Sequence, residues 1–266
     1  MNCILCNTED IQTVQEHSNA DKYQKLIKVD GWHIWNYCKA CDFYMSESSE
    51  TPEGRRKIYM KYWQKEMRGA TVEEFFPEAQ NIQLKLNMER IGWITQQSPL
   101  TPDTKVLDIG SGYATFPNTF KRLGQNIECL EPEPTNASYI RDTLKMPCYE
   151  CFYEDYKSDG KYTLIIMSNV LEHFENPIGM LKKAKGQLTE GGSIYIEVPE
   201  ASEFDLLPED HDDFNSLHLW FFSEKSLRKI LEMSGLAIKK LEVGTFKGFQ
   251  RSIIKRLRVM CEASND

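Results

Sequence analysis

Beyond residue 100, the chain alternates between short apolar runs and segments whose apolar residues recur at helical spacing. The apolar runs have the length of buried strands, and the periodic segments predict amphipathic helices. The expected strands cover residues 105–109, 126–131, 162–167, 193–198 and 236–243, and the expected helices cover residues 117–123, 137–145, 177–188 and 224–234. Repeated strand–helix units predict an α/β fold with a doubly wound, Rossmann-like and mostly parallel sheet, covered by helices on both faces.

Two further segments have mixed patterns. From residue 51 to 97, apolar residues recur at helical spacing, which predicts two or three helices broken near Gly69 and Pro77. A proline-containing boundary follows at residues 98–102. In residues 246–266, basic residues interleave with apolar ones, which fits either a last helix with one basic face or a final strand of the sheet. The pattern does not decide between the two.

Four of the eight cysteines form two C-x-x-C pairs near the start of the chain. Cys3 pairs with Cys6, and Cys38 pairs with Cys41, so that four thiolates could complete a tetrahedral shell around a structural Zn²⁺. Expected strands at residues 23–29 and 32–37, with a turn at residues 30–31, predict the hairpin of a zinc ribbon. The 31 residues between the pairs exceed the usual spacing, which leaves two pairs of buried thiols as the alternative. A redox pair is disfavoured, because neither motif ends a strand in a βαβ unit.

These patterns divide the chain into four parts. We expect a small zinc-ribbon-like module over residues 1–50, a helical linker or cap over 51–100, the sheet domain over 101–245 and a basic C-terminal segment over 246–266.

Composition narrows the class of protein further. The 266 residues are 41% hydrophobic, which suffices for a buried core and excludes a disordered or fibrous chain. The formal net charge of -8 gives no general attraction to nucleic acid or to anionic membranes. No apolar run approaches the roughly 20 residues that span a bilayer, and the first residues lack the pattern of a signal peptide. We expect a cytoplasmic protein, and its oligomeric state does not follow from the sequence.

The first expected strand runs into a loop with the sequence Asp108-Ile109-Gly110-Ser111-Gly112. Open α/β sheets bind ligands at the carboxyl ends of their strands, and glycines permit a sharp turn and a close approach. The third glycine of a dinucleotide fingerprint is replaced by Thr115. Asp108 would repel a pyrophosphate but attract an ammonium group, and Glu131, after the second strand, can accept hydrogen bonds from ribose hydroxyls. Together these features favour S-adenosylmethionine, which carries an ammonium, a sulfonium and a ribose.

From about residue 105 to 243, the sequence resembles the class I S-adenosylmethionine-dependent methyltransferases. The resemblance rests on residues 106–112, on Glu131, on residues 162–174 with their Leu-Glu-His, on the Gly-Gly before the strand at 193–198, and on residues 218–223. It implies a seven-stranded sheet and cofactor contacts from Asp108, Gly110, Gly112 and Glu131. It also implies that Phe152 packs on the adenine ring and that Ser168 and Asn169 lie beside the methionine portion.

The combination of a cysteine module with this pattern is similar to enzymes that methylate nucleotide-linked deoxysugars. Those enzymes carry a further C-terminal domain that helps to grip the sugar nucleotide. This sequence ends shortly after the methyltransferase pattern, which favours a smaller acceptor or a hydroxyl as nucleophile.

Two histidines are candidates for the base that a hydroxyl acceptor requires, since histidine titrates near neutral pH. His173 follows the strand at residues 162–167, and His218 lies in the acid-rich stretch 199–222, which we expect to form a lid over the acceptor. A structural role for either histidine, in which it hydrogen-bonds a loop or a helix start, is equally compatible with the pattern.

The sequence thus predicts an enzyme that transfers the methyl group of S-adenosylmethionine to a small acceptor. The preferred acceptor is a hydroxyl of a sugar, a nucleotide sugar or a phosphorylated surface-polysaccharide precursor. The alternatives are a nucleic acid or protein methyltransferase that uses the cysteine module as a reader, and a cofactor-binding module without catalysis. The net charge disfavours nucleic acid, although the basic C-terminal segment is a reservation.

Overall fold

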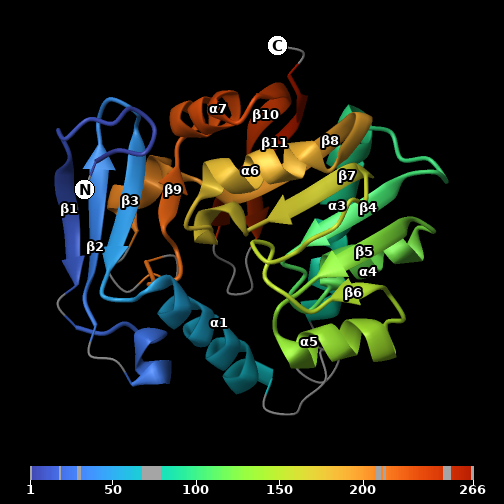
Figure 1. The fold of residues 1–266 in the computed structure, drawn as a ribbon, viewed down its shortest axis with the longest axis horizontal. Helices are drawn as coiled ribbons and strands as arrows, with labels where there is room; N and C mark the ends of the chain where they lie inside the picture. Colours follow the sequence, from blue (N-terminus) through green and yellow to red (C-terminus); the bar gives the residue numbers. More distant parts are fainter. Residues whose placement is uncertain are drawn as a thin grey trace.

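The computed structural model describes residues 2–17, 19–28, 31–67, 79–207, 211, 214–247 and 253–264. It contains one large and one small sheet, with helices packed around the large one (Figure 1). Several residues singled out in the sequence lie outside the described part, namely Asp30, Gly69, Pro77, Glu209, Asp210, Asp212, Asp213 and Arg251.

The large sheet has seven strands in the order β10-β11-β8-β7-β4-β5-β6. The strands are β4 (Lys105–Ile109), β5 (Asn126–Leu130), β6 (Cys148–Tyr149), β7 (Tyr162–Ser168), β8 (Leu188–Pro199), β10 (Leu236–Lys247) and β11 (Ile253–Ala263). Strands β4 to β8 pair in parallel, whereas β11 is antiparallel to both β8 and β10. The predicted mostly parallel, Rossmann-like sheet is therefore confirmed.

Helices cover both faces of the large sheet. They are α3 (Ala79–Gln97), α4 (Thr115–Arg122), α5 (Pro134–Ser138), the π-helical turn η2 (Tyr139–Thr143), η3 (Leu171–His173), α6 (Pro177–Gly186) and α7 (Glu224–Met233). Successive side chains of a strand point to opposite faces. Leu107 and Ile109 of β4 accordingly join a core with α6 and α7, whereas Val106 joins a second core with α3 and α4.

The small sheet is antiparallel, in the order β1-β2-β3-β9. Its strands are β1 (Gln12–His17), β2 (His33–Cys38), β3 (Phe43–Ser48) and β9 (Trp220–Phe222). The first three come from the first fifty residues, and β9 is supplied by a segment some 170 positions later that pairs with β3. No periodic pattern in the sequence predicts that last strand.

The strand predicted at residues 23–29 is wrong. A short 3-10 helix, η1 (Gln24–Ile27), occupies this segment, and β1 takes the expected place beside β2. The physical cause is local: the Asp21 carboxylate accepts the backbone N–H groups of Tyr23 at 2.8 Å and Gln24 at 2.7 Å, which starts a helical turn. The Gln24 side chain is then buried and donates to Glu50 at 2.8 Å.

Helix α1 (Pro52–Met67) runs from the small sheet towards the carboxyl edge of the large one (Figure 1). It begins directly after β3, and its Tyr62 ring lies 5.1 Å from that of Tyr23.

The final segment, whose type the sequence left open, is the strand β11 inside the large sheet. Its apolar Leu257 and Val259 are buried and alternate with Arg256 and Arg258. Among the helices of the described residues, none is long and apolar enough to cross a membrane.

Candidate active site

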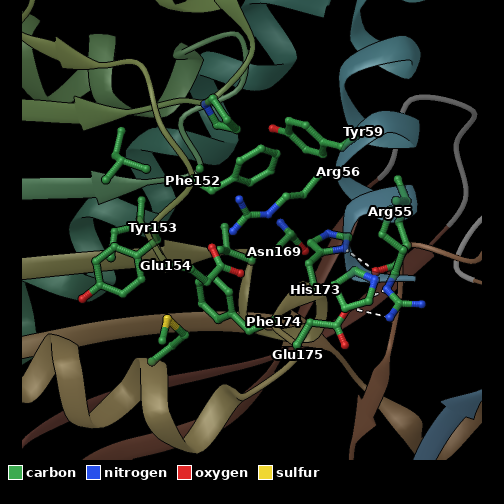
Figure 2. Close-up of a pocket in the computed structure, with 18 of the residues that line it drawn as sticks. Arg55, Arg56, Tyr59, Phe152, Tyr153, Glu154, Asn169, His173, Phe174 and Glu175 are labelled. Carbon is green, nitrogen blue, oxygen red and sulfur yellow. Dashed lines mark hydrogen bonds and ion pairs between the residues drawn. The ribbon is translucent and has the colours of Figure 1, made fainter. Parts of the chain in front are cut away.

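A cavity of about 430 Å³ lies at the carboxyl ends of β4, β5 and β7, and α1 forms one of its walls (Figure 2). The lining residues come from α1, the glycine loop and four further segments: Pro52, Arg55, Arg56, Tyr59, Ile109, Gly110, Gly112, Leu130, Pro132, Phe152, Tyr153, Glu154, Ser168, Asn169, Val170, His173, Phe174, Glu175, Asn176, Met180 and Leu217. Six of the residues predicted from the sequence thus meet in one cavity: Gly110, Gly112, Phe152, Ser168, Asn169 and His173.

The glycine loop is fastened to the end of β5. The N–H groups of Gly110 and Ser111 donate to the Leu130 carbonyl at 2.8 and 3.1 Å. Gly110 has a φ of 71°, and a Cβ added there would lie 2.7 Å from Cγ2 of Val170. Both the backbone conformation and the space therefore require glycine at this position.

Glu131 lies directly beneath the loop and is fully buried. Its carboxylate accepts the N–H of Gly112 at 2.8 Å, the N–H of Glu133 at 2.9 Å and the hydroxyl of Tyr59 at 3.3 Å. Burial raises the pKa of this carboxyl to about 7, although the hydrogen bonds oppose the shift. The acid therefore couples the loop to α1.

Asp108 is 3% exposed in β4, one residue before the strand ends. Burial raises the pKa of its carboxyl to about 7, against a smaller opposite effect of a hydrogen bond from Ser111. Among the described residues that line the cavity, neither Asp108 nor Glu131 is present. The two acids are therefore buried behind the cavity wall, outside the lining in which the sequence analysis places them.

The contribution of α1 could not be read from the sequence pattern. Arg55 forms an ion pair with Glu175 at 2.6 Å. Arg56 forms an ion pair with Asp155, also at 2.6 Å. The Arg56 guanidinium lies 4.5 Å from the centre of the Phe152 ring (Figure 2). The helical spacing of residues 51–97 indicates a helix, but it carries no signal for which part of the sheet that helix covers.

His173 is the histidine that reaches the cavity. Its Nδ1 lies 2.8 Å from the Leu217 carbonyl oxygen. Because a carbonyl can only accept, this contact requires a proton on Nδ1. The His218 ring centre lies 4.8 Å from that of His173, but His218 is not among the described residues that line the cavity. The fully buried Glu172 is close to both rings: one ligand atom of each of the three side chains lies within 4.8 Å of the others.

The expected acidic lid over the cavity does not appear in the part of 199–222 that the structure describes. There, η4 (Ala201–Leu206) packs on the small sheet, with the Phe204 ring 4.0 Å from that of Tyr44. Of this stretch, Leu217 is the described residue that lines the cavity. The cause is hydrophobic, because Phe204 and Phe214 bury their rings against Trp35 and Phe221.

The four cysteines of the two C-x-x-C motifs lie together at one end of the small sheet. Their sulfur atoms are all within 4.8 Å of one another, and Cys6 and Cys38 are 3.7 Å apart. A tetrahedral Zn²⁺ with bonds of about 2.3 Å places its sulfur ligands about 3.8 Å apart, so the cluster fits that ion. Lys229 of α7 lies 3.6 Å from the Cys41 sulfur and supplies a positive charge beside the thiolates. Of the other cysteines, Cys129 and Cys261 are buried, and Cys148 and Cys151 are half-buried.

Comparison with known proteins agrees with this geometry. A family model described as a methyltransferase domain matches residues 63–241. The fold is similar to 1,6-didemethyltoxoflavin-N1-methyltransferase of Burkholderia thailandensis, with a TM-score of 0.58, 12% identity and coverage of 87% of this chain and 99% of that one. It is also similar to an S-adenosylmethionine-dependent methyltransferase of Methanosarcina mazei (TM-score 0.55, 12% identity, 65% and 98% covered).

A third similar structure is a glycopeptide N-methyltransferase in complex with S-adenosylmethionine, with a TM-score of 0.52, 13% identity and coverage of 66% and 93%. At these identities, the likeness shows the fold. The family match covers most of the chain, and it includes β4, β5, β7 and the glycine loop. The chain therefore belongs to the methyltransferase-domain family, and its fold is that of the S-adenosylmethionine-dependent methyltransferases to which it is similar.

Proposed function

We propose that the cavity binds S-adenosylmethionine along the carboxyl edge of β4, β5 and β7. Gly110 and Gly112 allow the close approach of the amino acid portion, and Asp108 attracts its ammonium group from beneath the loop. Glu131 accepts the ribose hydroxyls, Phe152 packs on the adenine ring, and Ser168 and Asn169 lie beside the methionine portion. The observation that carries the proposal is that this loop, the aromatic ring and His173 all border one cavity.

The bound cofactor would supply a methyl group on a sulfonium, which leaves the protein to hold the acceptor in line and to take up its proton. His173 is placed for the second task, because its ring lines the cavity and its Nδ1–H is held by the Leu217 carbonyl, so that Nε2 is the nitrogen that would take up the proton. His218 packs beside it, and the buried Glu172 carboxylate close to both rings can stabilise the charge that develops on the imidazole.

The proposed acceptor is a small molecule with a hydroxyl, of the sugar, nucleotide-sugar or phosphorylated polysaccharide-precursor type. A cavity of about 430 Å³ that must also hold the cofactor leaves room for a small group, and α1 forms one of its walls. The net charge of -8 also disfavours nucleic acid as acceptor.

The cysteine cluster is proposed to bind a structural Zn²⁺ through Cys3, Cys6, Cys38 and Cys41. Four sulfur ligands leave no open position, so the ion would stabilise the small sheet and take no part in methyl transfer. Elemental analysis of the purified protein tests this: one zinc per chain is expected, and a metal-free, stably folded chain would refute it.

Calorimetry with S-adenosylmethionine tests the cofactor site. The wild-type protein should bind S-adenosylmethionine but not NAD, and Asp108→Ala should lose that binding while its circular dichroism is unchanged. Undiminished affinity in the variant would contradict the assigned role. Incubation with methyl-labelled cofactor and separated fractions of small metabolites, nucleic acids and proteins then identifies the acceptor class by the fraction that gains label. Label in nucleic acid or protein would overturn the small-acceptor proposal.

A further inference from the structure

We propose that Trp220 is a positioning residue that links the cysteine cluster to His173 and thereby fixes the ring orientation and tautomer of that histidine. The inference rests on the proposed function for the role of His173 as a base. It gives the small sheet a task in the active site, although none of its strands lines the cavity among the described residues.

The first link joins the cysteine cluster to β9. Directly after Cys41, the Asp42 carbonyl accepts the hydroxyl of Ser223 at 2.6 Å, which ties the second C-x-x-C turn to the start of α7. The next residue, Phe43, is paired with Phe222 across β3 and β9. Four thiolates held by Zn²⁺ would therefore fix the position of β9 through two adjacent backbone contacts.

The second link is the Trp220 side chain. Its ring stacks on Phe43, with centres 5.6 Å apart and an angle of 12° between the planes. Its Nε1–H donates to the Phe174 carbonyl at 2.7 Å in a buried hydrogen bond. One side chain thus contacts both the residue that follows the cysteine turn and the residue that follows His173.

The third link is the backbone that leads into β9. The Leu219 carbonyl accepts the N–H of Ser46 at 2.9 Å, and the Leu219 N–H donates to the Glu172 carbonyl at 2.8 Å. Leu217, two residues earlier, accepts the Nδ1–H of His173. Residues 217–219 are therefore held between β3 on one side and the 172–174 segment on the other. This fixes the position of the Leu217 carbonyl, which accepts a hydrogen bond from the proton-bearing Nδ1 of His173.

The links act in series and are buried. Phe43, Phe174, Leu219 and Trp220 belong to the same apolar core as Cys38 and Cys41. Close-packed cores transmit a displacement because their side chains have no free space to absorb it. Loss of the metal or of the Trp220 donor is therefore expected to release the Leu217 carbonyl from His173. The Nδ1 proton of His173 could then move to Nε2. Nε2 is the nitrogen that must take up the proton of the acceptor hydroxyl, so the ring would no longer serve as the base.

Nitrogen-15 NMR of the full-length, zinc-loaded protein with labelled histidine tests the proposal without any acceptor. His173→Gln assigns the signal among the five histidines. In the wild type, we expect the proton on Nδ1 in slow exchange with water. In Trp220→Phe, and in wild type stripped of metal by a chelator, we expect a shift towards the Nε2–H tautomer and about tenfold faster exchange, the effect of losing one hydrogen bond. Trp93→Phe, another buried tryptophan in the opposite core, should match the wild type.

Identical His173 signals in wild type, Trp220→Phe and metal-free protein would overturn the proposal, as would a wild-type proton on Nε2. Should Trp220→Phe fail to fold, a tryptophan analogue with sulfur in place of the ring N–H, introduced at position 220, removes the donor and keeps the shape. S-adenosylmethionine calorimetry on the same samples separates the two proposals. If S-adenosylmethionine does not bind but the His173 signal changes in Trp220→Phe and in metal-free protein, the proposed function alone is refuted. If S-adenosylmethionine binds normally but the His173 signal does not change, the positioning role alone is refuted.

Discussion

The large and the small sheet are stabilised by different kinds of contact. The large sheet has an apolar core on each face, closed by α6 and α7 on one side and by α3 and α4 on the other. The small sheet shares its cysteine-bearing face with the first of these cores, and on its other face Trp35, Tyr44 and Phe221 pack against Phe204 and Phe214. The large sheet is thus packed by helices on both faces, whereas the small one is completed by a strand from the later part of the chain and, as we propose, by a metal ion.

The largest expected effect follows from breaking the small sheet at its metal. Cys38→Ser should lose the metal and several kcal/mol of unfolding free energy, since a structural zinc contributes on the order of 10 kcal/mol in small domains. Urea unfolding and elemental analysis measure both. Cofactor affinity should fall far less, because the cofactor residues belong to the large sheet. Cys151→Ser, outside the cluster, should keep its metal. Full metal content in Cys38→Ser would refute the ligand assignment.

A second variant breaks the large sheet and leaves the metal site intact. Arg90 of α3 donates to the fully buried Glu197 of β8 at 2.5 and 3.0 Å. Arg90→Met removes the cationic partner of that carboxylate, which keeps the hydrogen bond from the Tyr195 hydroxyl, and should cost about 3 kcal/mol of unfolding free energy with unchanged zinc content. Arg228→Met removes an exposed pair with Glu224 on α7 and should cost under about 1 kcal/mol. Equal losses in the two variants would contradict the structure.

The third change acts on the cofactor loop. Gly110→Ala forces a side chain into a positive-φ backbone, 2.7 Å from Val170, at the end of β4. The loop should shift, and calorimetry should show cofactor affinity lowered about thirtyfold, equivalent to about 2 kcal/mol. Gly92→Ala in α3 meets no atom within 4 Å and should bind normally. A normal affinity for Gly110→Ala would place the cofactor elsewhere.

The smallest expected effect is a pH dependence confined to the large sheet. Burial raises the pKa of Asp108 to about 7, above its value in the unfolded chain, so ionisation destabilises the cofactor-free fold as pH rises from about 4 through 7. The ammonium group of the cofactor prefers the ionised carboxylate, so affinity should increase about tenfold between pH 6 and 8. Asp108→Asn should reduce this increase, and what remains would come from Glu131, whose pKa burial also raises to about 7. A profile that is flat in the wild type would exclude the ionisation of Asp108 from binding.

The same two sheets differ in how far the sequence predicts them. The strands and helices beyond residue 100 are visible because each carries its own periodic pattern, and consecutive βα units pair with near neighbours. The glycine loop and His173 follow strand ends of that pattern, whereas Phe152, Ser168 and Asn169 are implied by the resemblance to the methyltransferases, and all of them line one cavity.

The small sheet was mispredicted because its pairing is not local. Residues 23–29 have the apolar composition of a strand, but hydrogen bonds to the Asp21 carboxylate start the helical turn η1 there. No periodic pattern predicts that residues 220–222 pair with residues 43–45. The place of α1 was missed likewise, because Tyr59 meets Glu131 across 72 positions of sequence. Contacts between residues that lie far apart in the sequence depend on how the elements pack, and they leave no periodic pattern in the sequence.

The central claim is that the carboxyl edge of β4, β5 and β7 binds the methyl donor. A crystal structure of the protein grown with S-adenosylhomocysteine, the demethylated product, tests it most directly. The account predicts the adenine against Phe152, the ribose hydroxyls on Glu131 and the amino group over Asp108, with the sulfur turned towards His173. The ligand bound at any other place, or a cavity that stays empty at saturating ligand, would contradict it.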